Sequence, residues 1–235
     1  MRIAAIIPAK GHSTRLKDKN TLSVAGKPLF LWTVEAALGT EQINKVFVST
    51  ESEEVKRLCP PEAVILDRPE CLTQDSVQVA DVCLFALRQI EGTYGTYDVV
   101  IILAPTSPLR TSFHIRQAIS IYKDYGHLGS VISCYTDPYY HWTYSETKPS
   151  QIEPILHTPG HRKGKQDFGE REWPLVENGA IYIVKAARFV ETGNFRLPPF
   201  YPYIMPADDS IDVDFMEDKI RAEARLEGGK KNFSP

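Results

Sequence analysis

The sequence predicts an α/β fold in which helices cover both faces of a sheet, and two observations lead to this prediction. Short apolar runs alternate along the chain with longer stretches in which apolar residues recur at helical spacing. With 235 residues, 43% of them hydrophobic and 24% charged, the chain is long enough to bury a full core. We therefore expect a single domain, residues 1–235, that carries one insertion.

The individual elements follow from the same alternation. The apolar runs predict strands at residues 2–8, 45–49, 63–66, 99–103, 130–134, 180–184 and 201–205. The helical spacing predicts helices at residues 28–38, 77–90, 113–125 and 215–226. Sheets of this class bind ligands at the carboxyl ends of their strands, so functional residues are expected in the loops that follow the strands.

Charge and hydropathy exclude several classes of partner. A formal net charge of -3 and a pI near 6.1 argue against a protein that binds nucleic acid through broad electrostatics. No apolar stretch reaches the length of a bilayer, and the N-terminal apolar run is too short for a secretory signal. We expect a cytoplasmic protein with neither a nucleic-acid partner nor a membrane partner.

The loop after the first predicted strand is dense in cations, hydroxyls and small residues. It contains Lys10, Gly11 and Ser13, and then Lys19 and Asn20. Small residues let backbone N–H groups approach an anion, and the lysines supply the charge that a polyphosphate needs. The loop has neither the spacing of a P-loop nor the three glycines of a dinucleotide site. It predicts nucleotide chemistry, with a merely solvated surface loop as the alternative.

Two further clusters follow or border predicted strands. Thr106, Ser107 and Arg110 leave the strand at residues 99–103 through a proline-stiffened turn, and hydroxyls with a guanidinium suit a polyhydroxylated carboxylate. Arg110 either grips an anion directly or braces the loop from within. Asn178 precedes a glycine at the start of another strand, so Asn178 and Tyr182 either serve turn and strand structure or hydrogen-bond a ligand.

An acidic segment follows the last predicted strand. Asp212 and Asp214 are two residues apart in extended backbone, so their side chains share one face and can converge on a hard divalent cation. A nucleoside triphosphate arrives as its magnesium complex, which makes Mg²⁺ the expected cation. Glu217 and Asp218 are interpreted differently, as acids favoured at the N-terminus of the following helix.

Residues 137–174 do not fit the alternation of strands and helices. The segment is rich in Pro, His, Tyr, Gly and charge, shows no sustained period, and is too long for an ordinary connection. Aromatic residues such as Tyr139, Trp142, Tyr144 and Trp173 are concentrated in it, and exposed aromatics at this density usually contact a partner surface. The segment is therefore predicted to be an inserted lid or dimerisation arm, with a mobile surface loop as the alternative.

Taken together, these residues resemble the acylneuraminate cytidylyltransferase family, the CMP-sialic acid synthetases and their bacterial nonulosonate relatives. The resemblance spans nearly the whole chain, and six blocks in the family's order are more specific than any one of them. The blocks are residues 7–11 with Ser13 and 19–20, residues 48–50, residues 68–69 with Leu72 and Asp75, residues 105–110, residues 178–182 and residues 210–214.

The resemblance implies a Rossmann-like nucleotidyltransferase fold, a mostly parallel mixed sheet flanked by helices, and a homodimer. It implies a reaction of CTP with a 2-keto-3-deoxy sugar acid that gives a CMP-sugar and pyrophosphate and requires Mg²⁺. Lys19 would stabilise the charge of the triphosphate, and Asp212 and Asp214 would carry the metal. The implied nucleotide contacts are Lys10, Gly11, Ser13, Asn20 and Arg68, and the implied sugar contacts are Thr106, Ser107, Arg110, Gln166, Asn178 and Tyr182.

Departures from the family pattern lie on the sugar side or weaken the contacts with phosphate, so the resemblance supports the nucleotidyl transfer better than the identity of the sugar. Lys10 stands where the family commonly has arginine, Thr14 where many members have lysine, with Arg15 next to it, and Ala104 where a glutamine is typical. The alternatives are a cytidylyltransferase for an eight-carbon keto-deoxy acid, a nucleotidyltransferase for another sugar or alditol phosphate, and a degenerate nucleotide-binding subunit. Retention of Lys19 and of both aspartates argues against the last.

Overall fold

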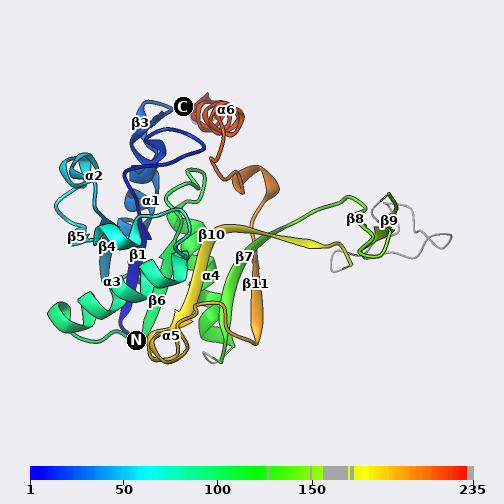
Figure 1. The fold of residues 1–235 in the computed structure, drawn as a ribbon. Coiled ribbons are helices and arrows are strands. Elements are labelled where there is room, and N and C mark those ends of the chain that lie inside the picture. The colour runs from blue at the N-terminus through cyan, green and yellow to red at the C-terminus, as the bar shows by residue number, and fades with distance from the viewer. Residues whose placement is uncertain (126–127, 149, 156–168, 170–171, 232–235) are drawn as a thin grey trace.

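A seven-stranded sheet forms the centre of the molecule (Figure 1). The computed structural model describes residues 1–125, 128–148, 150–155, 169 and 172–231. The strand order is β11-β7-β10-β6-β1-β4-β5, and β10 is the one strand of this sheet that runs antiparallel to its neighbours. The predicted mostly parallel mixed sheet is therefore confirmed.

All seven predicted strands are present. They are β1 Ile3–Pro8, β4 Lys45–Thr50, β5 Val64–Asp67, β6 Val99–Leu103, β7 Ser130–Thr136, β10 Leu175–Lys185 and β11 Phe200–Ile204. The largest difference is in β10, which begins well before residue 180. Its first residues pair with the end of β7, and the register shifts between Glu177 and Tyr182, where Gly179 has a φ of 72°. The Asn-Gly turn signal thus marks an irregularity inside one strand, because pairing with β7 continues on both sides of it.

The four predicted helices are also present, together with shorter elements that were not predicted. The predicted helices are α1 Leu29–Leu38, α3 Val79–Tyr94, α4 Ser112–Asp124 and α6 Met216–Lys231. The additional elements are α2 Glu53–Leu58, α5 Ala186–Thr192, the 3-10 turns η1 Lys19–Thr21, η2 Glu70–Leu72 and η4 Ala207–Asp209, and the hairpin of β2 Ser23–Val24 and β3 Lys27–Pro28. Elements this short contain too few turns to show a hydrophobic period.

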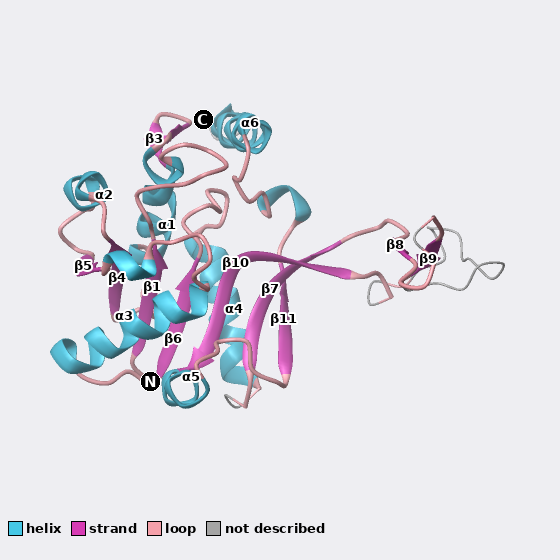
Figure 2. Ribbon diagram, viewed as in Figure 1, coloured by secondary structure: helices cyan, strands magenta, loops and turns pink. Residues whose placement is uncertain are grey.

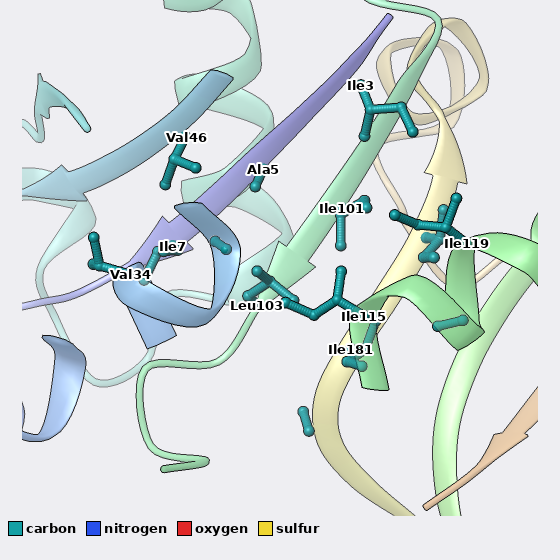
Figure 3. Close-up of a cluster of buried hydrophobic side chains, with 14 of the residues drawn as sticks. Ile3, Ala5, Ile7, Val34, Val46, Ile101, Leu103, Ile115, Ile119 and Ile181 are labelled. Atoms are coloured by element: carbon teal, nitrogen blue, oxygen red, sulfur yellow. The ribbon is translucent and has the colours of Figure 1, made fainter. Parts of the chain in front are cut away.

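The helices cover both faces of the sheet, as the alternation predicted. Along β1, Ile3, Ala5 and Ile7 face α1 and α4, whereas Ala4 and Ile6 face α3 and α5. Figure 3 shows the first of these two cores, in which side chains of β1, β4, β6 and β10 meet those of α1 and α4. Each fully buried isoleucine contributes about 1.5–3 kcal/mol to folding, so the sheet is a rigid base for the loops at its edge.

The insertion contains a hairpin that stands apart from the sheet. β8 Trp142–Tyr144 and β9 Ile152–Pro154 pair antiparallel, and Figure 2 shows them beyond the ends of β7 and β10, away from every helix. Tyr144 is 76% exposed and Ile152 is 56% exposed. These two strands were not predicted, because they are too short to show alternation in the sequence.

None of the helices within the described ranges has the length and apolar character that a membrane crossing requires.

Candidate active site

A cavity of about 380 Å³ opens where β1 and β6 end at the carboxyl edge of the sheet. Among the residues predicted for the site, those that line it are Lys10, Ser13, Lys19, Asn20, Arg68, Thr106 and Tyr182. They come from the loop after β1, the loop after β5, the loop after β6 and strand β10. The sheet therefore brings together residues that the sequence separates by more than 150 positions.

Hydrogen bonds within the loop after β1, and one to Glu51 just after β4, hold this loop in place. Asn20 is 3% exposed, and its side-chain amide donates to the carbonyl oxygen of Lys10 over 2.7 Å. The Gly11 N–H donates to Glu51 over 2.6 Å, and a Cβ at Gly11 would lie 2.7 Å from the Cβ of Ser52. Asn20 thus shapes the loop, and its buried Oδ1, which has no partner among the described residues, remains available to a ligand.

Lys19 meets a carboxylate from the other end of the chain. Its Nζ lies 2.6 Å from Oδ1 of Asp214, and Arg15 hydrogen-bonds the other oxygen of the same carboxylate. The Lys19 side chain is only 15% exposed, so this pair is better shielded from water than a surface ion pair. Arg15 was expected from the sequence as a possible substitute for the lysine that many family members have at Thr14, and its contact with Asp214 places it beside Lys19.

The second aspartate lies beside the same cluster. Ile211 and Val213 are buried in an apolar cluster that includes Leu109, so Asp212 and Asp214 project from the opposite face, as their spacing predicted. The N–H of Val213 donates to the carbonyl oxygen of Thr106 over 2.9 Å and ties this segment to the loop after β6. Asp212 is exposed as a residue, and its carboxyl group is hydrogen-bonded to the Thr106 side chain.

Burial and a neighbouring carboxylate raise the pKa of Asp212. The loss of water around its carboxyl group raises its pKa, and the nearby charge of Asp214 raises it further. A hydrogen bond with the Thr106 side chain and the charge of Lys19 oppose this shift. Asp218 has the structural role predicted for it, because its carboxylate accepts from the backbone N–H groups of Asp214 and Phe215 before α6.

Lys10 and Arg68, two of the predicted nucleotide contacts, form contacts with other protein groups. Lys10 forms an ion pair with Asp75, and this contact lowers the pKa of Asp75. Arg68 is 6% exposed, donates to the carbonyl oxygen of Ser49 over 2.7 Å and has Nη1 3.9 Å from Glu51. Its burial lowers the pKa of the guanidinium. Arg68 therefore supports the wall of the cavity, whereas Lys10 can exchange Asp75 for another anion.

The structure corrects two of the predicted sugar contacts. Arg110 is 1% exposed, and its Nη2 donates to the Thr33 hydroxyl over 2.5 Å and to the carbonyl oxygen of Ala104 over 3.1 Å. It borders a different, larger cavity of about 890 Å³ between α1, α4 and α6, and burial lowers its pKa to about 9. Ser107 is 2% exposed and does not line the 380 Å³ cavity. The turn folds both side chains inward, so Arg110 braces the loop.

Asn178 has a structural role as well. It is 7% exposed, and its Oδ1 accepts from the Ser133 hydroxyl over 2.6 Å and from the N–H of Ala180 over 3.1 Å. Its Nδ2 donates to the Ser210 hydroxyl over 2.9 Å. Asn178 thus joins β7, β10 and the acidic segment at the rim of a neighbouring cavity of about 520 Å³. Gln166 lies outside the described residues.

Tyr182 faces the cavity with partners that the sequence did not indicate. Its hydroxyl donates to Glu177 and accepts from Nη2 of Arg196 over 3.1 Å. Arg196 itself lines the cavity. No sequence signal marked it, because it lies in an irregular segment after α5 and only the fold places it against Tyr182.

Comparison with known proteins identifies relatives of this chain. The family model described as Cytidylyltransferase matches residues 4–141. The N-acylneuraminate cytidylyltransferase of Escherichia coli is 33% identical over 219 residues, which cover 91% of this chain and 49% of that protein. The CMP-N,N'-diacetyllegionaminic acid synthase of Legionella pneumophila is 32% identical over 236 residues, which cover 97% of each chain. The chain thus spans about half the length of the first relative and nearly all of the second.

Two solved structures share the fold at low sequence identity. A CMP:2-keto-3-deoxy-manno-octonic acid synthetase in complex with CTP has a TM-score of 0.67 and 17% identity, over 97% of this chain and 100% of that one. The 4-diphosphocytidyl-2C-methyl-D-erythritol synthase of Anaerococcus prevotii has a TM-score of 0.70 and 11% identity, over 96% of each chain. With the family model and the 32% identical relative that spans the chain, the conclusion is that this chain belongs to the cytidylyltransferase family.

Proposed function

We propose that this chain transfers CMP from CTP to a 2-keto-3-deoxy sugar acid of the nonulosonic type and releases pyrophosphate. The observation that carries the proposal is the contact between Lys19, which lines the 380 Å³ cavity, and Asp214, because it joins the cationic loop after β1 to the acidic segment before α6. The relatives at 32–33% identity are named for nine-carbon acids, and this favours such an acid over an eight-carbon one.

In this reaction, the residues of the site would neutralise phosphate charge and position the reactants. The triphosphate of CTP would lie along Lys10, Lys19 and Arg15, with Lys10 exchanging Asp75 for a phosphate oxygen. The anomeric hydroxyl of the acid would attack the α-phosphorus, so that a new O–P bond forms as the bond to pyrophosphate breaks. Such a transfer depends on in-line positioning and on neutralising the phosphate charge, which are the roles proposed for these cations.

Mg²⁺ is proposed as the cofactor, and the donors of the site suit it. Asp212, Asp214 and the Thr106 hydroxyl present oxygen atoms, the ligands that this hard cation prefers. Within the described ranges, no group of three or more His, Cys, Asp and Glu side chains is placed to hold a metal ion. This fits Mg²⁺, which is usually held by one or two carboxylates together with substrate phosphates. When bound, the ion would neutralise phosphate charge and acidify the acceptor hydroxyl.

The test is pyrophosphate release from CTP with a panel of acids. The protein is incubated with CTP, Mg²⁺ and either a nine-carbon or an eight-carbon keto-deoxy acid, with an EDTA control and a UTP control. We expect the highest kcat/KM with a nine-carbon acid and no release with EDTA. Preferred turnover of an eight-carbon acid contradicts the acceptor class. CTP binding without release from any acid contradicts the activity and favours a nucleotide-binding subunit.

We further propose that the protein is a homodimer in which the β8–β9 hairpin contacts a second copy. Trp142, Tyr144, Ile152 and Ile155 are all exposed on this hairpin, and an isolated two-stranded hairpin is at best marginally stable in water. Cover by a second copy would bury the exposed side chains of Tyr144, Ile152 and Ile155.

Analytical ultracentrifugation tests the dimer. We expect the wild type to sediment as a dimer and the double variant Tyr144→Asp/Ile152→Asp as a monomer, because two charges would be buried at the interface. Thr143 lies on the opposite face of the same strand, so Thr143→Asp is the matched control and should remain dimeric. A monomeric wild type, or a double variant that remains a dimer, contradicts the proposed contact.

We also propose that the reaction takes place in the cytoplasm. All four cysteines are free, and Cys83 and Cys134 are buried, which suits a reducing compartment. Cell fractionation with an antibody against the chain tests this, and recovery outside the cytoplasmic fraction contradicts it.

A further inference from the structure

A cluster of charged and polar side chains lies where two cavities meet. Tyr182 lines both the 380 Å³ cavity and the 520 Å³ cavity, Arg196 lines the first, and Glu177 lines the second. Nε of Arg196 donates to Oε1 of Glu177 over 3.0 Å, and the Tyr182 hydroxyl bridges the two charged groups. The three side chains form one connected wall of the site.

The cluster is held in one geometry and still faces solvent. The Arg196 guanidinium lies 4.8 Å from the ring centroids of both Tyr182 and Phe195, which orients it by stacking. Its side chain is 44% exposed and that of Glu177 is 41% exposed. Among the described residues, no acceptor faces Nη1 of Arg196, so this nitrogen can donate to a ligand. Burial raises the pKa of Tyr182, so its hydroxyl keeps its proton.

The position of the cluster decides which part of the acceptor can reach it. Tyr182 is on β10, which is separated from β1 by β6, so it lies about 10 Å across the sheet from the strand that carries the phosphate loop. In a 2-keto-3-deoxy acid, the carboxylate and the attacking hydroxyl are bonded to the same carbon atom. The carboxylate would therefore stay beside the α-phosphate, and the remaining carbon chain could reach the part of the cavity that Tyr182 lines.

The charge of the cluster decides what it can recognise. Glu177 and Arg196 neutralise each other, so a ligand carboxylate would gain one cation and meet one anion. A hydroxyl can donate to Glu177 and accept from Arg196 at the same time, and hydrogen bonds to charged groups are stronger than those between neutral groups. A paired acid and base therefore suits a neutral hydroxylated group.

We propose that Glu177, Tyr182 and Arg196 determine acceptor specificity by hydrogen-bonding a hydroxyl group on the part of the sugar acid remote from its carboxylate. This inference rests on the proposed function, since it concerns the acceptor of that same reaction. It assigns Glu177 and Arg196 to the acceptor and leaves the binding of CTP to the loop after β1.

The first measurement is steady-state kinetics of Arg196→Ala. We expect the KM for the sugar acid to rise about 10- to 100-fold, the loss typical of a hydrogen bond to a charged group, with the KM for CTP unchanged. Arg188→Ala is the matched control, because Arg188 is an exposed arginine on α5 that pairs with Glu191 and lines neither cavity. It should leave both KM values unchanged. A rise in the KM for CTP alone, or no rise for the acid, overturns the proposal.

The second measurement uses deoxy analogues of the best acceptor. For one analogue, which lacks a single remote hydroxyl, we expect kcat/KM with the wild type to fall by about the same factor relative to the full acceptor. With Arg196→Ala, removing that hydroxyl should lower kcat/KM little further. If every analogue lowers kcat/KM by the same factor in the wild type and in Arg196→Ala, Arg196 has a merely structural role and the proposal is overturned. Coupling of Arg196 to the carboxylate, detected with an amide analogue of the acid, overturns it as well.

Two conservative variants test the proposal even if Arg196→Ala does not fold. Arg196→Lys keeps the charge but loses the fork of donors, and Glu177→Gln keeps the size but loses the anion. Both are expected to unfold near the wild-type temperature and to raise the KM for the acid with the KM for CTP unchanged. If the wild type releases no pyrophosphate with any acid, the proposed function fails. If the wild type is active and these variants match it, only the present inference fails.

Discussion

The two halves of the cavity differ in how their residues come together. On the nucleotide side, Lys10, Lys19 and Asn20 belong to one loop, and the partner of Lys19 belongs to a second short motif around Asp214. On the acceptor side, Tyr182 meets Glu177 from the irregular part of β10 and Arg196 from the segment after α5. The proposed phosphate contacts are thus concentrated in short motifs, whereas the proposed acceptor contacts come from separate segments.

This difference has a physical basis. A polyphosphate needs several cations and backbone N–H groups within a few ångströms, and one loop at the end of a strand can supply them. A sugar acid presents hydroxyls over a longer span, so its contacts must come from several elements. The following predictions test that contrast, from the largest expected effect to the smallest.

The largest effect is expected from Asp214→Asn. The substitution removes the charge that holds Lys19 and Arg15 and that is proposed to bind Mg²⁺, so kcat should fall by at least about 1000-fold in pyrophosphate release. The unfolding temperature should stay close to that of the wild type. Asp124→Asn, at the exposed end of α4, is the control and should be fully active. Activity of Asp214→Asn within tenfold of the wild type contradicts the metal assignment.

A large effect on stability is expected from Arg110→Ala. The substitution removes the hydrogen bonds to Thr33 and Ala104 and leaves a cavity, so the free energy of unfolding should fall by about 2–4 kcal/mol in urea denaturation. The KM for the acceptor should stay within about threefold, because Arg110 does not line the site. A selective rise in that KM with unchanged stability would restore Arg110 as a sugar contact.

A smaller effect is expected from Asp75→Asn. Asp75 occupies Lys10 in the free protein, and exposed ion pairs contribute up to about 1 kcal/mol. Freeing Lys10 should therefore lower the KM for CTP by up to about fivefold at low salt, and the gain should shrink at high salt. Asp81→Asn, on the exposed surface of α3, should change nothing. A raised KM for CTP would show that Asp75 contributes to binding instead.

The smallest effect is expected from the pH dependence of Asp212. Because the folded state raises the pKa of this carboxyl group, its ionised form destabilises the fold at pH 7. Asp212→Asn should therefore slightly raise the free energy of unfolding at pH 7. The gain should disappear below pH about 3.9, where the carboxyl group is protonated in both states. Destabilisation at pH 7 contradicts this expectation.

The comparison also shows which predictions from sequence were reliable. Strands such as β1 and β6 are continuous apolar runs, because both of their faces are buried between helices, and they were located to within a residue. The extension of β10 and the β8–β9 hairpin were missed, because they depend on pairing between segments that carry no strong pattern of their own. Among the site residues, charge and spacing correctly placed Lys19 and the two aspartates together.

By itself, the sequence determined the α/β class and the positions of the buried strands along the chain, and it marked the cationic loop after β1 as a candidate phosphate site, because these features depend on local composition and period. Only the tertiary structure decided the direction of side chains. It turned Arg110 and Asn178 inward to hydrogen-bond the protein, and it brought Arg196 to Tyr182 across 14 residues of chain. The physical reason is that a polar side chain contacts whatever the packing of distant segments places within about 3 Å, and no local pattern records that distance.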